Sequence, residues 1–448
     1  MLRLLEGSSV TFRNWLRSRV VGWLGAGMSD DLSVDGVEAV LAGADGRLAD
    51  PGFLMNADPE EVLALVDAAS GPAERLAGAV YRASAHLHRD ASAGVRRQLL
   101  ALDAARYGDR GLAARITAVL VEGEPAAPWG VKWATGSMVD RSLWQTLAGH
   151  TSTVSGIATG VVDGRPVAVT SSKDGTVRVW DLISGRQVGR PLTGDTHMVS
   201  GVAMGVVDGC PVAISGDDET VQVWDLAAGR QVGPPLIGDT HMVSGVAMGV
   251  VDGCPVAVIG SRDGSVQVWD LTTRQQFCEP LQDHVRSTVD AVATGVLDGR
   301  PVAVSSGQDR RVRVWDLTTG EPVGEPLTGH TDGVYGVATE VVEGCLFAVT
   351  GSMDETVRVW DLTSGEPVGE PLTGHTGWVY GVATGVVEGR PVAVTGSGDG
   401  TVRVWDLTTG RPAGPELVFP AEVYAVAVTS DGRLVVGFGH EVAVLARC

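Results

Sequence analysis

The dipeptide Trp-Asp recurs six times at nearly constant spacing, and this repetition restricts the fold more than any other feature of the sequence. The tryptophans are about 45 residues apart, at Trp180, Trp224, Trp269, Trp315, Trp360 and Trp405. A fixed period of roughly 20–50 residues is typical of repeat architectures, in which each unit buries its faces against its neighbours. Residues Gly194–Ala213 also recur letter for letter as Gly238–Ala257, so we interpret the units as structural repeats.

Each unit reads as four short β-strands. The unit that begins at Gly374 contains two apolar runs, "VYGVATGVV" and "RPVAVTG", then the alternating run "TVRVWDL" and a short fourth run, "RPAGPEL". Asp-Gly or Glu-Gly pairs separate the first runs, and such pairs favour tight hairpin turns because glycine tolerates a positive φ. We therefore predict four antiparallel strands in every unit.

The Gly-His early and the Trp-Asp late in these units resemble the WD-repeat family, whose fold is the β-propeller. The resemblance covers about residues 139–448 and implies seven blades, because a seventh unit without Trp-Asp follows Phe419. That last unit lacks a fourth strand. We predict that residues 139–147 supply it by pairing with the C-terminal blade, which would close the ring and remove two exposed sheet edges.

In WD-repeat proteins a His, a Ser or Thr, an Asp and the Trp form a buried hydrogen-bond chain within a blade. The resemblance implies complete sets in blades one, five and six: His150, Thr170, Asp174 and Trp180; His330, Thr350, Asp354 and Trp360; His375, Thr395, Asp399 and Trp405. Blade four offers Ser305, Asp309 and Trp315, with His284 displaced by one residue.

Blades two and three depart from this pattern. They keep Asp218 with Trp224 and Asp263 with Trp269, but an aspartate stands in each His position, and Ile259 replaces the Ser or Thr in blade three. We interpret the change as drift in a duplicated unit. The alternative is that the nearby His197 and His241 face a partner.

The N-terminal region, residues 1–125, is predicted to be α-helical, with residues 126–138 as a linker. Asp58-Pro59-Glu60-Glu61 is a helix start, and further helical segments run over about 73–89, 92–106 and 111–121. We interpret residues 12–24, "FRNWLRSRVVGWL", as a packing helix with a basic face; the alternative is a helix that lies on a membrane surface.

Helices followed by such blades are similar to the C-terminal part of large bacterial signal-transduction ATPases that end in WD repeats. This chain has no G-x-x-x-x-G-K-[ST] motif, so any such relation is to a part without the nucleotide-binding site.

Composition and motifs exclude several classes of function. A net charge of −20 argues against a nucleic-acid partner, and no apolar run is long enough for stable membrane insertion. Five cysteines without a C-x-x-C pair predict free thiols in a reducing cytoplasm. No G-x-S-x-G, H-E-x-x-H or Cys/His quartet occurs, so we predict no catalytic residue, no metal and no cofactor.

Residues that differ between the blades are the candidates for partner binding. In WD-repeat propellers the residue before the turn aspartate lies on the top rim, where partners bind, and this position holds Lys173, Arg262 and Met353. Loops that begin the blades add Arg286, Tyr335, Trp378, Tyr380 and Tyr424. The four aromatic residues would lie side by side on blades five to seven, and such residues are favoured at interface cores. The alternative is ordinary packing at strand ends.

The sequence therefore predicts a mainly β protein, a seven-bladed propeller preceded by a small helical domain, that serves as a non-enzymatic scaffold for a protein partner. One alternative is the sensor part of a split or degenerate signalling NTPase, acting on a partner NTPase. The other is a propeller enzyme with an acidic channel.

Overall fold

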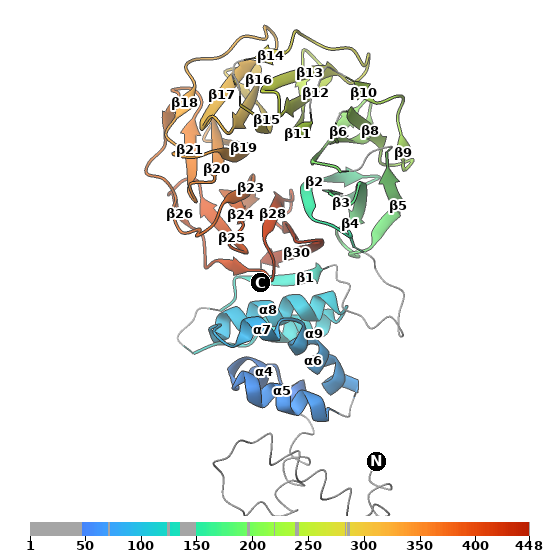
Figure 1. The fold of residues 1–448 in the computed structure, drawn as a ribbon, viewed down its shortest axis with the longest axis vertical. Helices are drawn as coiled ribbons and strands as arrows, with labels where there is room; N and C mark the ends of the chain where they lie inside the picture. The colour runs from blue at the N-terminus through green and yellow to red at the C-terminus, as the bar shows by residue number, and fades with distance from the viewer. Residues whose placement is uncertain are drawn as a thin grey trace, which may run out of the picture.

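Two parts make up the structure, a computed structural model: a set of short helices and a ring of seven β-sheets (Figure 1). The described residues are 47–69, 72–122, 126–134, 149–194, 198–218, 220–237, 242–282, 284 and 287–447. The prediction of a seven-bladed propeller preceded by helices is confirmed.

The helices begin where the sequence places capping side chains. Asp58 accepts a hydrogen bond from the Glu60 amide, with Pro59 at the first helical position, and Asp109 accepts one from the Leu112 amide. Their apolar faces pack together around Leu54, Val62 and other buried residues. The elements are a 3₁₀ turn, η1 (Arg47–Ala49), and the helices α4 (Pro51–Asn56), α5 (Pro59–Ala68), α6 (Pro72–Ala83), α7 (Ala85–His88), α8 (Ala93–Arg106) and α9 (Arg110–Thr117).

Blades one to four are consecutive antiparallel sheets. Blade one contains β2 (Val154–Val162), β3 (Arg165–Ser172), β4 (Thr176–Asp181) and β5 (Gln187–Thr193). Blade two contains β6 (Gly201–Val207), β7 (Cys210–Gly216), β8 (Thr220–Asp225), β9 (Arg230–Gln231) and β10 (Leu236–Ile237). Blade three contains β11 (Val243–Val251), β12 (Cys254–Ser261), β13 (Ser265–Asp270) and β14 (Leu281–Gln282). Blade four contains β15 (Val289–Leu297), β16 (Arg300–Gly307), β17 (Arg311–Asp316) and β18 (Leu327–Thr328).

Blades five to seven complete the ring. Blade five contains β19 (Val334–Val342), β20 (Cys345–Ser352), β21 (Val357–Asp361) and β22 (Glu366–Pro367). Blade six contains β23 (Val379–Val387), β24 (Arg390–Ser397), β25 (Thr401–Asp406), β26 (Arg411–Pro412) and β27 (Leu417–Val418). Blade seven contains β28 (Val423–Val428), β29 (Leu434–Phe438), β30 (Glu441–Arg447) and β1 (Trp129–Ala134).

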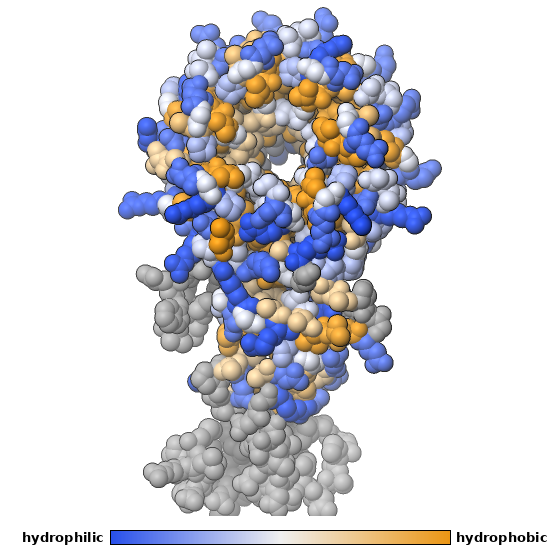
Figure 2. Space-filling model, turned by 180° about the vertical axis from the view of Figure 1, so that it is seen from behind, coloured by the Kyte–Doolittle hydropathy of each residue, from blue (hydrophilic) through white to orange (hydrophobic). Residues whose placement is uncertain are grey.

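The first strand of each blade lies innermost, around a central opening (Figures 1 and 2). Second strands such as β3 are buried almost throughout, because neighbouring blades cover both faces of the sheet. The turn between the first two strands of blade one has positive φ at both Asp163 and Gly164, as a tight hairpin requires. Antiparallel connections alternate between the two ends of a sheet. The turn between the second and third strands lies at the same end of each blade as the loop that leads into the inner strand, and we call this end the top face. The opposite end, with the turn between the first two strands, is the bottom face.

The strand that completes blade seven is β1, not the predicted segment 139–147. Trp129 pairs with Arg447 and Ala134 with Ala443, with an irregularity between Val131 and Trp133. The expected linker, 126–138, therefore contains the closing strand, and residues 139–147 lie outside the described part of the chain. Trp133 explains the choice in part, because its buried ring lies 6.1 Å from the Trp180 ring of blade one and its indole donates to Leu182 O.

The helices are fastened to the closed ring on the side of blade seven (Figure 1). Leu102 of α8 packs with Trp129, Phe419 and other apolar residues in one core. The side-chain amide of Gln98 in α8 makes two hydrogen bonds to the backbone beside β27: it donates to Glu416 O and accepts from the Val418 amide. The helices and the propeller thus share a core and are joined by hydrogen bonds from a helix side chain to the propeller backbone.

A buried cluster of charges reinforces this contact. Arg106 of α8 donates to Glu441 of β30 at 2.5 Å and to Asp103 at 2.6 Å, and all three side chains are at most 10% exposed. Burial raises the pKa of Glu441 to about 7, although the Arg106 guanidinium opposes this shift. Burial likewise raises the pKa of Asp103, and His440 lies 3.7 Å from Glu441. One cation is therefore shared between two buried carboxyl groups.

Glu441→Gln should alter the pH dependence of stability. The folded protein holds a proton on Glu441 up to about pH 7, whereas the unfolded chain releases it near the ordinary glutamate pKa of 4.5. The contribution of this group to the free energy of unfolding therefore falls as the pH rises from about 4.5 to 7, by up to about 3 kcal/mol. Urea unfolding at pH 5 and pH 8 should show a smaller loss in Glu441→Gln than in wild type. The exposed Glu366→Gln is the control, and an unchanged loss in Glu441→Gln would contradict the prediction.

Candidate functional site: the braced blades and an aromatic top face

A hydrogen-bond relay links four side chains across blade one. The Trp180 indole donates to Thr170 Oγ1 at 2.9 Å, and Thr170 Oγ1 lies 2.7 Å from His150 Nε2. His150 Nδ1 lies 3.1 Å from the Asp174 carboxylate. The chain is consistent if Thr170 donates to His150 Nε2 and His150 Nδ1–H donates to Asp174, because every donor then has an acceptor. This relay ties the inner-strand loop to the second and third strands.

Blades five and six repeat the same relay with nearly the same distances. The Thr-to-His separations are 2.9 and 2.8 Å, and each Trp donates to its Thr at 2.9 Å. The residues brought together are His330, Thr350, Asp354 and Trp360 in blade five, and His375, Thr395, Asp399 and Trp405 in blade six.

Protonation states in the relay follow from burial. Burial lowers the pKa of His150 by more than the neighbouring carboxylate raises it, so the imidazole is neutral at neutral pH. Burial alone raises the pKa of Asp174, but hydrogen bonds from His150, Thr176 and the Thr151 amide outweigh it and hold the pKa well below its usual range. Asp354 and Asp399 are held low in the same way. The acceptor is ionised, and such bonds are stronger than neutral ones.

Blade four builds the relay despite the displaced histidine. His284 Nε2 lies 2.9 Å from Ser305 Oγ, and Trp315 donates to the same hydroxyl at 2.8 Å. Asp309 accepts from His284 and from Arg313, and although burial opposes it, these contacts lower the Asp309 pKa to about 2. Although His284 is displaced by one residue in the sequence, its ring lies between Ser305 and Asp309, as the histidines of the other relays lie between their Thr and Asp.

Blades two and three are braced differently from blades one, four, five and six. Trp224 donates to Ser215, but the buried Asp217, not the predicted Asp218, accepts from the Thr220 amide and hydroxyl. The two aspartates are adjacent in the sequence, so the repeat pattern alone cannot choose between them.

In blade three Asp263 bonds to Ser265, and the Trp269 indole turns to Gln267 instead of a hydroxyl. Trp269 is 9% exposed, against 1% for Trp180. His197, His241 and the aspartates in the His positions lie outside the described residues.

The four predicted aromatic residues meet on the top face as a continuous row across blades five to seven. The Tyr335 ring stacks on Trp378 with centroids 6.3 Å apart, and Tyr380 lies 5.7 Å from Tyr335. Tyr380 is in turn 4.8 Å from Tyr424. The indole of Trp378 is 45% exposed, and the three tyrosines are partly buried beside it. We call these four residues the aromatic row.

The tyrosines occupy one position of the repeat, the second residue of the inner strand. The same position holds Ser155, Ser200 and Ser244 in blades one to three and Asp290 in blade four. Ser155 and Ser244 donate to the backbone of the next blade, at Val199 O and Val289 O. One side of the channel opening is therefore aromatic and the other small and polar.

The other predicted rim residues are placed around this row. Lys173 is exposed, and its Nζ lies 5.8 Å from the Tyr424 ring centroid, a cation–π contact between blades one and seven. Arg262 is exposed on blade three, and its charge acts on Asp290 and Tyr335. Met353 is half-buried in the turn of blade five, where its amide donates to Gly333 O. Arg286 lies outside the described residues.

Two carboxylates beside the aromatic row were not singled out from the sequence. Glu422 accepts a hydrogen bond from the Tyr424 hydroxyl, and Asp290 accepts from Thr288 at 3.1 Å. Burial raises the Asp290 pKa to about 6. Burial, together with these carboxylates, raises the pKa of Tyr335 and Tyr424, so both phenols stay neutral. Asp290 breaks the serine pattern of its repeat position, which is the signal that could have found it.

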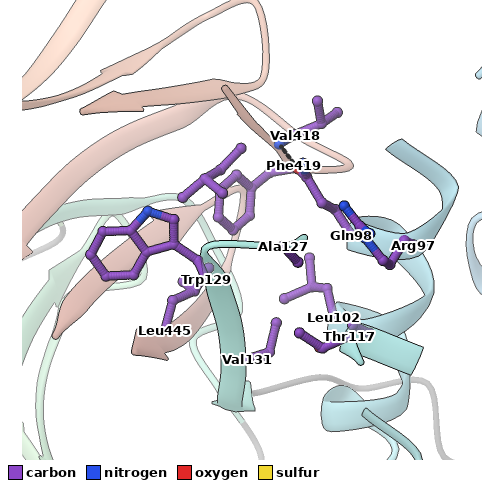
Figure 3. Close-up of a pocket in the computed structure, with 12 residues that line it drawn as sticks. Arg97, Gln98, Leu102, Thr117, Ala127, Trp129, Val131, Val418, Phe419 and Leu445 are labelled. Carbon is purple, nitrogen blue, oxygen red and sulfur yellow. Dashed lines mark hydrogen bonds between the residues drawn. The ribbon is translucent and has the colours of Figure 1, made fainter. Parts of the chain in front are cut away.

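Other kinds of site find no support in the described part of the chain. It contains no group of three or more His, Cys, Asp or Glu that could hold a metal ion, and none of its helices has the length and apolarity to cross a bilayer. A cavity of about 30 Å³ lies between α8, β1 and β27, where Gln98 bonds to Val418 (Figure 3). Its volume suits about two water molecules.

Comparisons with known proteins agree with this geometry. Residues 141–181, 320–361 and 365–406 match the family model "WD40: WD domain, G-beta repeat". A solved structure of the WD40 β-propeller domain of Doa1 is similar, with a TM-score of 0.54 and 23% identity over 67% of this chain and 95% of that chain. A search of curated proteins found no match. Three segments of the chain thus match WD40 repeats, and the described residues form a seven-bladed propeller. WD40 propellers generally mediate protein–protein interaction.

Thr395→Val should destabilise blade six. The substitution keeps the side-chain volume but leaves the Trp405 indole and His375 Nε2 without their buried partner, which costs about 1–3 kcal/mol. Urea unfolding and amide exchange of β24 and β25 measure the loss. The exposed Thr409→Val is the matched control, and equal stability of the two variants would show that the relay contributes little.

Proposed function

We propose that the protein is a non-catalytic scaffold that binds a partner protein on its top face, over blades five to seven. The observation that carries the proposal is the replacement of serine by tyrosine at one repeat position in three successive blades, with the exposed Trp378 beside them. Repeat units that serve only the fold need no such asymmetry. Partly exposed tyrosine and tryptophan supply large contact areas at little entropic cost, and they dominate the binding energy of many interfaces.

Charges at the ends of the row would set the orientation of the partner. Lys173 lies at one end and Arg262 toward the other, with Glu422 and Asp290 between them. Charged groups around an apolar centre contribute to specificity and association rate more than to affinity. This arrangement supports a partner surface with an apolar centre and mixed charges at its edge.

The alternative is that the chain regulates a partner NTPase as part of a bacterial signalling system. The rigid connection of α8 to blades six and seven favours it, because binding on the propeller would then reposition the helices. Both the scaffold proposal and the NTPase alternative include a cytoplasmic location. Four free thiols support it: Cys210, Cys254, Cys278 and Cys345. A propeller enzyme finds no comparable support.

Trp378→Ala combined with Tyr380→Ala should weaken partner binding by tenfold or more, since truncating a central aromatic anchor typically costs about 2 kcal/mol. Affinity purification with quantitative mass spectrometry identifies the partners that are lost, and titration of the purified partner gives the affinity. Ser200→Ala changes the same repeat position in blade two, and Ile183→Ala removes an exposed apolar side chain at the bottom face. Undiminished recovery with the aromatic variant, or equal losses in the controls, would refute the top-face assignment.

A further inference from the structure

Six exposed valines surround the channel opening at the bottom face, away from the aromatic row. Each is the last but one residue of an inner strand, and each is 50–61% exposed: Val161, Val206, Val250, Val296, Val341 and Val386. Blade seven has no counterpart, because β28 ends at Val428 and the buried Thr429 follows. We call this set, open at blade seven, the valine horseshoe.

The valines stand on strand ends that are in contact with one another. A side chain at Gly160 would meet Met204 of the next blade, and one at Gly205 would meet Met248. Single exposed apolar residues are common on protein surfaces, but apolar residues that gather around one opening are typical of an interaction site. Each valine is paired across its hairpin with a residue of the second strand, Val161 with Pro166 for example, and at least half of its side-chain surface stays exposed.

Charge beside the horseshoe indicates what can cover it. An exposed acidic residue follows each valine by two positions: Asp163, Asp208, Asp252, Asp298, Glu343 and Glu388. Arginine stands two residues further on in blades one, four and six, but blades two, three and five have Cys210, Cys254 and Cys345 there. The horseshoe thus has an excess of negative charge. Two copies face to face would oppose like charges, whereas a cationic apolar segment is complementary.

We propose that residues 12–24 of the same chain cover the valine horseshoe. This segment, "FRNWLRSRVVGWL", holds Arg13, Arg17 and Arg19 and no acidic residue. Its apolar side chains, Trp15 and Trp23 among them, lie on the valines in this arrangement. The arginines face the unbalanced carboxylates of Asp208, Asp252 and Glu343.

The connection is long enough for this contact. Twenty-three positions separate Leu24 from Arg47, where the described helices begin, and such a chain spans at most about 75–80 Å. A compact protein of this length has a radius of gyration of roughly 22 Å, so the whole molecule is within reach. The helices also pack on the outer side of blade seven, the one blade without such a valine (Figure 1). In the proposed arrangement, residues 12–24 reach the channel opening on the side of blade seven, where the horseshoe has no valine.

Thiol labelling of the intact protein tests the proposal, because Cys210 and Cys345 are exposed free thiols beside the horseshoe. N-ethylmaleimide labelling is followed by mass spectrometry, with Cys278, on the loop before β14, as the internal reference. Replacing Arg13, Arg17 and Arg19 by Glu should raise the labelling rate of both exposed thiols about tenfold, as expected if the segment covers the horseshoe about nine-tenths of the time. Val206→Ser/Val250→Ser/Val341→Ser should do the same, and so should high salt.

Val188→Ser/Val368→Ser is the matched control, because Val188 is exposed in the outer strand β5 and Val368 is exposed directly after the outer strand β22, so both should leave labelling unchanged. A synthetic peptide of residues 11–25 should restore protection to the arginine variant. Equal labelling of wild type and the arginine variant would overturn the proposal. Protection that grows with protein concentration would also overturn it, because residues 12–24 would then cover a second copy. Binding of wild type to anionic phosphatidylserine vesicles, with equal thiol protection in all variants, would overturn it as well.

Discussion

Pairing between β1 and β30 is the contact on which the rest of the structure depends. A propeller blade cannot bury both faces alone, so seven blades are stable only when the ring is closed and each sheet is covered on both sides. The hydrogen bonds from Trp129–Ala134 to Ala443–Arg447 close it. Because the same short strand follows the helices in the chain, closure also fixes α8 against blades six and seven, where Arg106 and Gln98 secure it.

Within the closed ring, the blades share a backbone plan but are not equally braced. Blades one, four, five and six each hold a relay from Trp through a hydroxyl and His to Asp, while blades two and three use Asp217 or Gln267 instead. The aromatic row spans blades five to seven, two of which have the full relay. Firm support under a binding surface limits the entropy lost on association. The less braced blades carry serine, not tyrosine, at the channel opening.

Sequence reasoning succeeded where a residue has one structural role that repeats. The six Trp-Asp pairs, together with the seventh unit after Phe419, specify the number of blades. His150, Thr170 and Asp174 meet as the repeat implies. It failed for the closing strand, because outer strands are short and carry little pattern: β22 and β26 have two residues each. Tertiary packing of Trp133 on Trp180 contributes to the choice of closing strand, and no local sequence pattern reports it.

The position of β30 at the far end of the propeller sequence has a consequence for biosynthesis. Blades one to six leave the ribosome first, yet β1, made more than 300 residues earlier, has no strand partner until residues 441–447 leave the exit tunnel. Until then β1 and the two terminal blades present unpaired edges, the state in which nascent chains associate wrongly. Helices α8 and α9 pack against β1 and can shelter it during that wait, so that the nascent chain keeps its closing strand protected.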